Sequence, residues 1–184
     1  MAIFGRWKAE HQLRERAERY VAGLLQEPDA GDVEWLAGSA TRGDADHAAW
    51  ELRYARRALG LVAAQRDALD DQTGAEVAHV MAAAFERDTR IARDRLELAQ
   101  QQFNARLSAY RDAVGSRVTA ATPARLGRTL VAFAGGGFKD VDEHVTRGGA
   151  LLGAYLAQAN ESLRALFGTA SLPEHVPPSS TTRR

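Results

Sequence analysis

The sequence contains no cysteine, which excludes disulfide bonds, thiolate nucleophiles and metal sites built on thiolates. Isoleucine occurs only at Ile3 and Ile91, so the β-branched side chains that strands favour are scarce. No apolar run approaches the ~20 residues that a membrane-spanning helix needs, and the first residues lack the apolar segment of a secretory signal. These absences indicate an α-helical protein, which we expect to be cytoplasmic.

Neither sign of charge is in excess. The chain has 24 basic and 24 acidic residues and a formal net charge of zero. Nucleic-acid binding rests on a surplus of positive charge that faces phosphates, so we expect no nucleic-acid partner.

What the sequence does have is 36 alanines among leucine, arginine, glutamine and glutamate, all of which favour helices. A chain of 184 residues fits one core. We therefore predict an all-α fold, a single-core bundle of about six helices over residues 1–168. Residues 169–184 are rich in proline, serine and threonine, and we expect them to be a disordered tail.

Apolar spacing of three and four residues locates the helices. The widest apolar stripe, over residues 48–69, predicts a central helix that packs on two sides. Asp44 or Asp46 is expected to cap it, and Thr73 with Glu76 matches a capping box for the next helix. Further helices are predicted over 7–26, 32–37, 96–114, 123–133 and 140–167, the last with a potential break at Gly148–Gly149.

One short motif raises a metal site as an alternative. A carboxylate-bridged dimetal centre in a helical bundle uses two Glu-x-x-His pairs and two further glutamates. Glu76 and His79 form one such pair, and Glu51 is a candidate third ligand. The second Glu-x-x-His pair is missing, because Tyr54 stands three residues after Glu51. We favour a capping and surface role for Glu76 and His79, and expect no cofactor.

Two sets of residues are candidates for contact with a protein partner. Phe103, Arg106 and Tyr110 recur at helical spacing and would form a binding surface if their stripe is not wholly buried. Gly149 and Gly153 are spaced to allow close approach of another helix, within the core, in a homodimer or from a membrane-protein client.

The N-terminus combines apolar and basic side chains. Within residues 1–8, Ile3, Phe4 and Trp7 alternate with Arg6 and Lys8, a combination that suits a membrane interface. Packing of these residues back onto the bundle is the interpretation we favour, because acidic residues follow closely. Peripheral contact with an inner membrane remains the alternative.

Several stretches resemble one known family in their order and character. They are the start Ile3–Arg6, Tyr20–Ala22, the Leu/Arg-rich run Leu52–Leu59, and the later segments Val80–Asp88 and Phe103–Tyr110. This order is similar to that of the ubiquinol–cytochrome c reductase assembly chaperone family, over residues 3–134. The family's aromatic loop before the long helix is absent, since residues 38–46 read GSATRGDAD. The C-terminal glycine-rich helix also has no clear counterpart there.

The resemblance implies a role in binding newly made cytochrome b during assembly of a respiratory complex, without catalysis. We therefore expect a non-enzymatic helical interaction protein, with a membrane-complex subunit as its sharpest candidate partner. A ferritin-like metalloenzyme and a self-associating structural protein remain alternatives.

Overall fold

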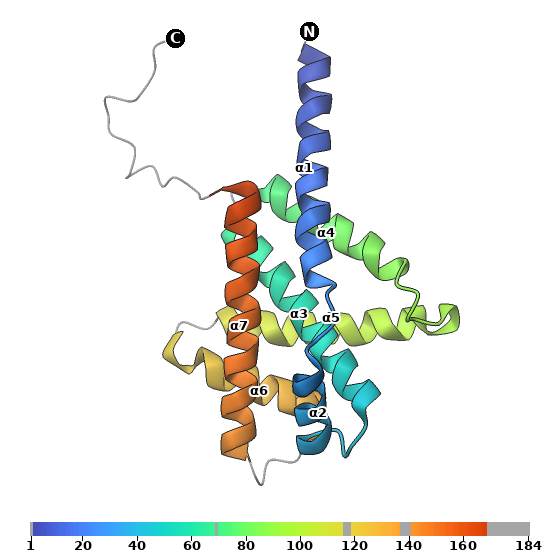
Figure 1. The fold of residues 1–184 in the computed structure, drawn as a ribbon. Helices are drawn as coiled ribbons and strands as arrows, with labels where there is room; N and C mark the ends of the chain where they lie inside the picture. Colours follow the sequence, from blue (N-terminus) through green and yellow to red (C-terminus); the bar gives the residue numbers. More distant parts are fainter. Residues whose placement is uncertain (1, 69, 116–118, 137–140, 169–184) are drawn as a thin grey trace.

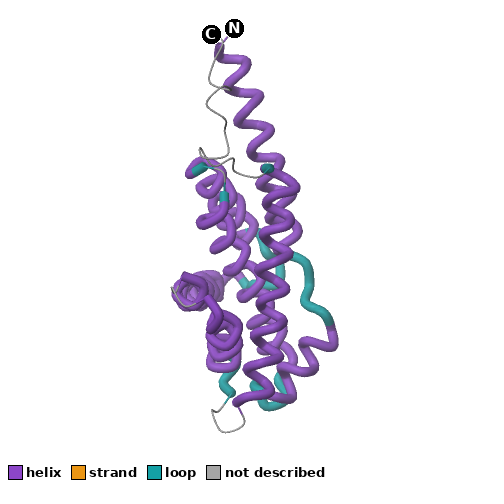
Figure 2. The backbone as a smooth tube through the Cα atoms, turned by 90° about the vertical axis from the view of Figure 1, so that its left-hand side faces the viewer, coloured by secondary structure: helices purple, strands orange, loops and turns teal. Residues whose placement is uncertain are grey.

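The computed structural model describes residues 2–68, 70–115, 119–136 and 141–168, and these residues form helices and connections without any strand. The prediction of an all-α fold is therefore confirmed (Figures 1 and 2). The described residues form seven α-helices and two short 3-10 turns, η1 (Arg93–Arg95) and η2 (Thr119–Ala121). The helices are α1 (Ala2–Leu24), α2 (Ala30–Ser39), α3 (Ala45–Asp67), α4 (Asp71–Glu86), α5 (Leu96–Gly115), α6 (Thr122–Phe133) and α7 (Val141–Phe167).

Helix α3 is the centre of the bundle. Most of its apolar residues are buried on adjoining faces, including Leu52, Ala55, Leu59 and Val62. Each of the other six α-helices packs against it, with α5 and α7 making the most extensive contacts. The wide apolar stripe thus corresponds to a helix that is covered on several sides, as predicted.

Helices α4 and α5 diverge from the connection that joins them. In Figure 1, α4 extends from this connection up toward α1, whereas α5 extends from the same connection across the molecule below α4. Helix α4 packs mainly on α1, and α5 packs on α3 and α6. The two helices therefore form the sides of a wedge, with α3 between them.

The helix starts are set by aspartates. Asp44 caps α3, since its carboxylate accepts a hydrogen bond from the backbone N–H of His47 at 2.9 Å. Asp70 caps α4 in the same way, from Thr73 N–H at 2.7 Å. The predicted capping box at Thr73 and Glu76 is wrong, because Thr73 lies inside the first turn of α4 and is buried. Asp70 is three residues earlier and supplies the acceptor that the helix start needs.

Helix α7 continues through Gly148 and Gly149 without the break that the sequence allowed. It crosses α6 closely, because a Cβ atom on Gly127 would overlap the backbone of Val145, and one on Gly149 would overlap the backbone of Pro123. The glycines thus allow two backbones to approach more closely than side chains would permit. The predicted tail, residues 169–184, lies outside the described residues.

The N-terminal half of α1 extends beyond the body of the bundle (Figures 1 and 2). Burial on this helix begins at Ala17 and includes Tyr20, Val21 and Leu24. The turns over residues 7–16 are largely exposed, and Trp7 is 65% exposed. Across the described residues, no helix combines the length and apolar character required to span a membrane.

Candidate functional site

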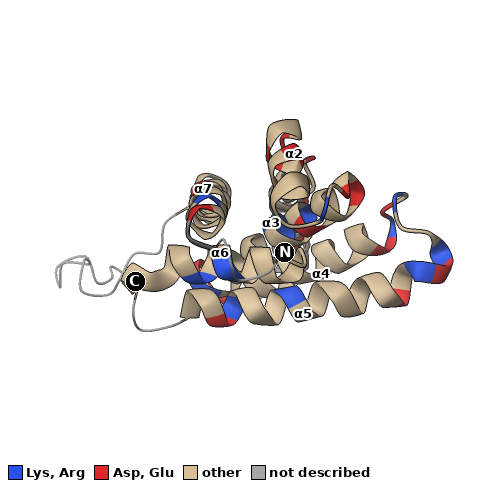
Figure 3. Cartoon of the chain, turned by 90° about the horizontal axis from the view of Figure 1, so that it is seen from below, with Lys and Arg blue, Asp and Glu red and all other residues tan. Residues whose placement is uncertain are grey.

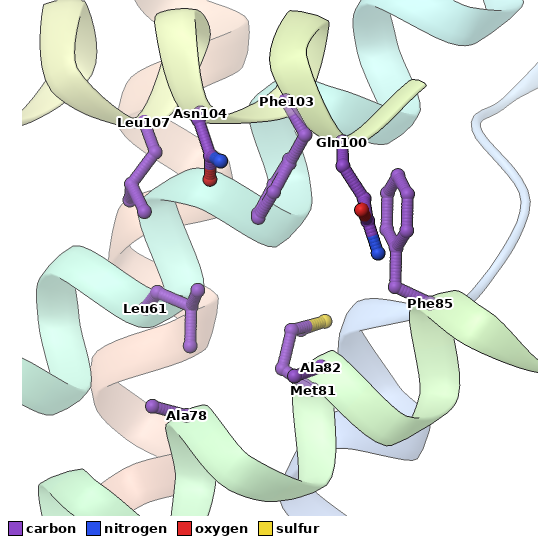
Figure 4. A pocket seen from close by; sticks show the side chains of 9 residues that line it. All are labelled: Leu61, Ala78, Met81, Ala82, Phe85, Gln100, Phe103, Asn104 and Leu107. Carbon is purple, nitrogen blue, oxygen red and sulfur yellow. The ribbon is translucent and has the colours of Figure 1, made fainter. Parts of the chain in front are cut away.

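The wedge between α4 and α5 contains an apolar groove of about 300 Å³ (Figure 4). Met81 and Phe85 project into it from α4, and Phe103 and Leu107 face them from α5. Leu61 of α3 closes the floor. Large apolar side chains thus enter the groove from three helices.

Smaller and polar residues form the rim of the groove. On the α4 side the rim is formed by the short side chains of Ala78 and Ala82, one turn apart. On the α5 side it is formed by the side-chain amides of Gln100 and Asn104, also one turn apart. Ala82 and Asn104 are exposed. The short alanine side chains allow close approach of a partner backbone. The amides can form hydrogen bonds with polar groups of that partner.

The groove exists because α4 and α5 separate after their connection instead of packing together along their length. Met81 and Phe85 are one turn apart, and so are Phe103 and Leu107, so each pair lies on one face of its helix. Phe85 and Phe103 meet with ring centroids 5.4 Å apart near the closed end of the wedge. We call this recess, lined by these four residues with Leu61, Ala78, Ala82, Gln100 and Asn104, the α4–α5 groove.

Of the three aromatic and basic residues predicted to meet a partner, only Phe103 lines this groove. Phe103 is 8% exposed, Arg106 is 9% exposed and Tyr110 is fully buried. Arg106 and Tyr110 therefore belong to the interior, and no exposed stripe joins the three. The helical periodicity of the sequence could not distinguish a buried stripe from a binding surface.

Arg106 is buried because it pairs with Glu51 of α3. Its Nε donates to Glu51 Oε2 at 3.0 Å, and its Nη2 contacts Oε1 of the same carboxylate. His47 Nε2 lies 3.3 Å from Glu51 Oε1. The guanidinium also lies over the Phe133 ring, with 4.4 Å between Cζ and the ring centroid. This bidentate pair joins α3 to α5 in the interior.

Tyr110 lies one helical turn beyond Arg106 and packs its ring against Phe133, with centroids 6.5 Å apart. Its hydroxyl is buried and has no hydrogen-bond partner among the described residues. Burial raises the pKa of Tyr110 far above its ordinary value, and the Glu51 carboxylate adds to the shift. The phenol is thus held neutral in the folded protein.

A second set of charges fixes the connection between α4 and α5. Asp88 accepts from the buried Arg57 of α3 at 2.7 Å and from Arg90 Nε at 2.7 Å. Arg90 also pairs with Glu27, which follows α1, and Glu27 accepts from Arg53 Nη2 at 2.8 Å. This five-residue network ties the end of α1, the middle of α3 and the α4–α5 connection together.

The alternative metal ligands Glu51, Glu76 and His79 are not brought together. Glu51 is buried against Arg106, whereas His79 is exposed on α4 and Glu76 faces α1 beside Glu15 and Glu18. The described part of the chain has no cluster of three or more histidine, aspartate or glutamate side chains suited to a metal ion.

The glycines predicted to permit close helix approach differ in their surroundings. Gly149 is buried against Pro123 of α6, so its small size serves packing within one chain and not a dimer surface. Gly153 has no atom within 4 Å of the position that a Cβ would occupy, which leaves room for a side chain there. No partner chain is needed to account for either residue.

Residues 2–8 lie at the projecting end of α1, and Met1 is outside the described residues. Trp7 and Lys8 are exposed, and Trp7 makes an edge contact with His11 at 5.7 Å between ring centroids. The packing of this region against the bundle that we favoured does not occur at Trp7, whose side chain is directed to solvent.

Comparison with known proteins adds no relative. No family model, no curated protein and no solved structure matches this chain.

Sequence reasoning missed most of the groove. The predicted central helix contains Leu61 and the helix predicted over 96–114 contains Phe103, but the spacing gave no role to the rim residues Ala82 and Asn104. The paired spacing of large side chains on two consecutive helices was the available signal. It could have identified the groove only with the angle between α4 and α5, which the sequence does not contain.

Proposed function

We propose that this protein is a non-enzymatic interaction protein that receives an apolar helical segment of a protein partner in the α4–α5 groove. The observation that carries the proposal is the groove itself, an apolar recess of about 300 Å³ between diverging helices. Helix-in-groove recognition places apolar side chains of an amphipathic helix into such a recess. A recess of about 300 Å³ is at the lower end of the ~300–1,000 Å³ range of small-molecule sites, and it can accommodate one or two anchoring side chains.

The rim supports a helical partner. A helix lying along α4 would meet Ala78 and Ala82, where no long side chain blocks its backbone. Its opposite edge would meet the amides of Gln100 and Asn104. Its anchoring side chains would then contact the Met81 and Phe103 side chains inside.

In its most specific form, the proposal is that the protein acts as an assembly chaperone for a membrane respiratory complex. Of the two later segments that resemble the chaperone family, Val80–Asp88 covers the end of α4 and the two residues after it, and Phe103–Tyr110 belongs to α5. Met81, Phe85, Phe103 and Leu107 all come from these segments. In this form the bound helix would belong to a newly made membrane subunit such as cytochrome b.

A photocrosslinking experiment tests the proposal. A photoreactive phenylalanine analogue replaces Ala82, which is exposed in the groove, and in a control protein it replaces Ala154, which is exposed on α7. Both proteins are irradiated in detergent-solubilised membranes of the host, and crosslinked peptides are identified by mass spectrometry. We expect the Ala82 probe to capture an apolar helical segment that the Ala154 probe does not capture.

A substitution provides the second arm. Ala82→Arg places a charge in the groove without disturbing a buried residue, so the fold should persist while capture through a probe at Asn104 is lost. Equal capture by the Ala82 and Ala154 probes, or capture that survives Ala82→Arg, would contradict the proposal. Capture of a helix from a respiratory membrane subunit would support the chaperone form.

The other two functions have less support from the described residues. A carboxylate-bridged metalloenzyme would need Glu51 free, and Glu51 is paired with Arg106. A dimer through Gly149 would need that glycine on the surface, and it is buried against α6.

A further inference from the structure

A second recess lies between α3, the α4–α5 connection and α5, and encloses about 410 Å³. It uses a different face of α5 from the groove. This volume is in the ~300–1,000 Å³ range of sites for small molecules. We call it the polar cleft, and the residues of its lining that matter here are His47, Trp50, Glu51, Arg95, Leu98 and Arg106.

The charges of the polar cleft favour an anion. Three arginines line it, and Glu51 is the only acid among its described lining residues. The Glu51 charge is already neutralised by Arg106 through a bidentate pair. Arg90 is occupied by Asp88 and Glu27. Arg95 is the third lining arginine, and its ion-pair partner Asp94 is exposed to solvent.

Arg95 is available to a ligand. Its ion pair is with Asp94 at 3.8 Å, and the two side chains are 69% and 80% exposed. Ion pairs this exposed contribute little to stability, so an incoming anion can replace Asp94 at little cost. Figure 3 shows basic residues at the end of the molecule where α4 and α5 are joined.

The floor of the cleft is built from buried polar groups. Glu51 is 1% exposed and Arg106 is 9% exposed, and the Glu51 carboxylate holds His47 Nε2 at 3.3 Å. The His47 side chain is 41% exposed, so the imidazole reaches from the buried pair to the cleft. When the imidazole is protonated both nitrogens are donors, so Nδ1 can donate to an anionic ligand while Nε2 donates to Glu51.

The lip of the cleft is apolar. Leu98 is 44% exposed, and among the residues whose side chains the structure describes it is one of two exposed large hydrophobic residues, with Trp7. Ile91 and Trp50 lie at the same cleft and are half-buried. An exposed leucine beside an arginine suits a ligand with an apolar tail and a charged head.

We propose that the polar cleft binds a small anionic amphiphile, with a carboxylate or phosphate head at Arg95 and His47 and an apolar chain along Leu98 and Ile91. This proposal is independent of the α4–α5 groove, because the two recesses share no lining residue. A free fatty-acid-like molecule and a lipid headgroup in a bilayer offer the same chemistry.

Titration calorimetry with monomeric dodecyl phosphate, below its micelle concentration, tests the site. We expect one molecule to bind per chain, and Arg95→Gln to weaken binding about tenfold, the effect of a loss of about 1.4 kcal/mol. Leu98→Ser should also weaken it. Arg93→Gln is the matched control, since Arg93 is exposed on the same 3-10 turn but does not line the cleft. Uncharged dodecyl maltoside should bind more weakly than the phosphate.

Vesicles separate the two sources of the ligand. Phosphatidylcholine vesicles with and without phosphatidic acid are tested by co-sedimentation with the wild type and Arg95→Gln. Binding of the monomer identifies a free amphiphile, and Arg95-dependent binding to acidic vesicles alone identifies a lipid headgroup. The proposal is overturned if neither probe binds, or if Arg95→Gln binds as tightly as the wild type and Arg93→Gln.

Discussion

At the scale of single residues, Glu51 and Arg106 form an ion pair in the interior, as do Arg57 and Asp88. Both residues are buried, and Arg106 Nε donates to Glu51 at 3.0 Å. Arg106→Met leaves the Glu51 carboxylate buried without its cation, and we expect a loss of about 3–5 kcal/mol in the free energy of unfolding. Urea denaturation measures this loss.

A double variant separates the stabilisation that comes from the Glu51–Arg106 interaction from the contributions of the two residues to other contacts. Glu51→Leu with Arg106→Met replaces both charges by apolar side chains of similar size, and such replacements are often neutral or stabilising. The double variant should therefore recover most of the stability that the single variant loses. A double variant as unstable as Arg106→Met would show that the guanidinium stabilises mainly through Phe133 and Tyr54.

Tyr110 and Tyr20 form a second matched comparison. The Tyr20 hydroxyl donates to the Gly60 carbonyl at 2.9 Å, whereas the buried Tyr110 hydroxyl has no partner among the described residues. Tyr20→Phe should lower stability by about 0.5–1.5 kcal/mol. Tyr110→Phe should leave it unchanged or raise it, because an unsatisfied buried hydroxyl is removed. A loss for Tyr110→Phe similar to that for Tyr20→Phe in urea denaturation would contradict this assignment.

The raised pKa of Tyr110 also predicts a dependence on alkaline pH. The folded protein keeps the phenol neutral, while the unfolded chain ionises it near pH ~10. The stability that this provides is complete below that pH and falls as pH rises above it, by about 1.4 kcal/mol per pH unit for one proton. Tyr110→Phe should reduce this slope relative to the wild type when urea denaturation is repeated above pH ~10.

At the scale of helices, the crossing of α6 and α7 depends on glycine. A Cβ on Gly127 would overlap the Val145 carbonyl, and one on Gly149 would overlap Pro123. We expect Gly127→Ala and Gly149→Ala to be destabilising by more than the ~1 kcal/mol that alanine gains over glycine in a helix. Gly153→Ala is the control, because no atom lies within 4 Å of its Cβ position, and it should be neutral or stabilising in thermal denaturation. Equal tolerance of all three changes would contradict the close crossing.

The start of α4 gives a prediction for acid pH. The backbone N–H of Thr73 lowers the pKa of the Asp70 carboxyl, since it donates to the charged form. The stabilisation is present above the unfolded pKa of about 3.9 and is lost as pH falls through the lower folded value. Asp70→Ala should cost about 1 kcal/mol at neutral pH.

Asp70→Asn separates the cap from its charge. Asparagine caps a helix about as well as aspartate, so stability at neutral pH should be retained. The part of the acid-induced loss that comes from Asp70 should disappear in this variant. An acid denaturation profile identical to that of the wild type would show that Asp70 is not a source of the pH dependence.

The sequence was sufficient to predict most helices, because apolar spacing and turn residues are local signals. It placed α3 at the centre from its wide stripe. It did not identify Asp70 as the cap, since Thr73 and Glu76 offered a competing local pattern. Pairing of Glu51 with Arg106 spans 55 positions in the sequence and depends on how α3 and α5 cross. Alanine-rich helices allow several crossing angles, so neither this pair nor the groove could be derived from periodicity.

At the scale of the whole molecule, the charge network around Asp88 holds the α4–α5 connection on the bundle. Arg57, 1% exposed, and Arg90 both donate to Asp88, and Arg90 reaches Glu27 after α1. The groove lies between α4 and α5, and the polar cleft is lined in part by Arg90 and Ile91 of the connection. We therefore expect the angle between α4 and α5, and the shape of both recesses, to depend on the buried carboxylate of Asp88.

Asp88→Asn removes the negative charge that the buried Arg57 requires. We expect a loss of up to about 3–5 kcal/mol in global stability, as for other broken buried pairs. Amide hydrogen exchange should increase most in the last turns of α4 and the first turn of α5, because local opening starts where the tether is lost. Asp94→Asn is the control: Asp94 is 80% exposed, and its pair with Arg95 contributes little.

If exchange in Asp88→Asn rose equally in all helices, the network would stabilise the bundle as a whole instead of fixing the wedge. Because the proposed partner helix must fit between α4 and α5, selective loosening of the connection should also reduce crosslinking through Ala82, while crosslinking in Asp94→Asn stays at the wild-type level.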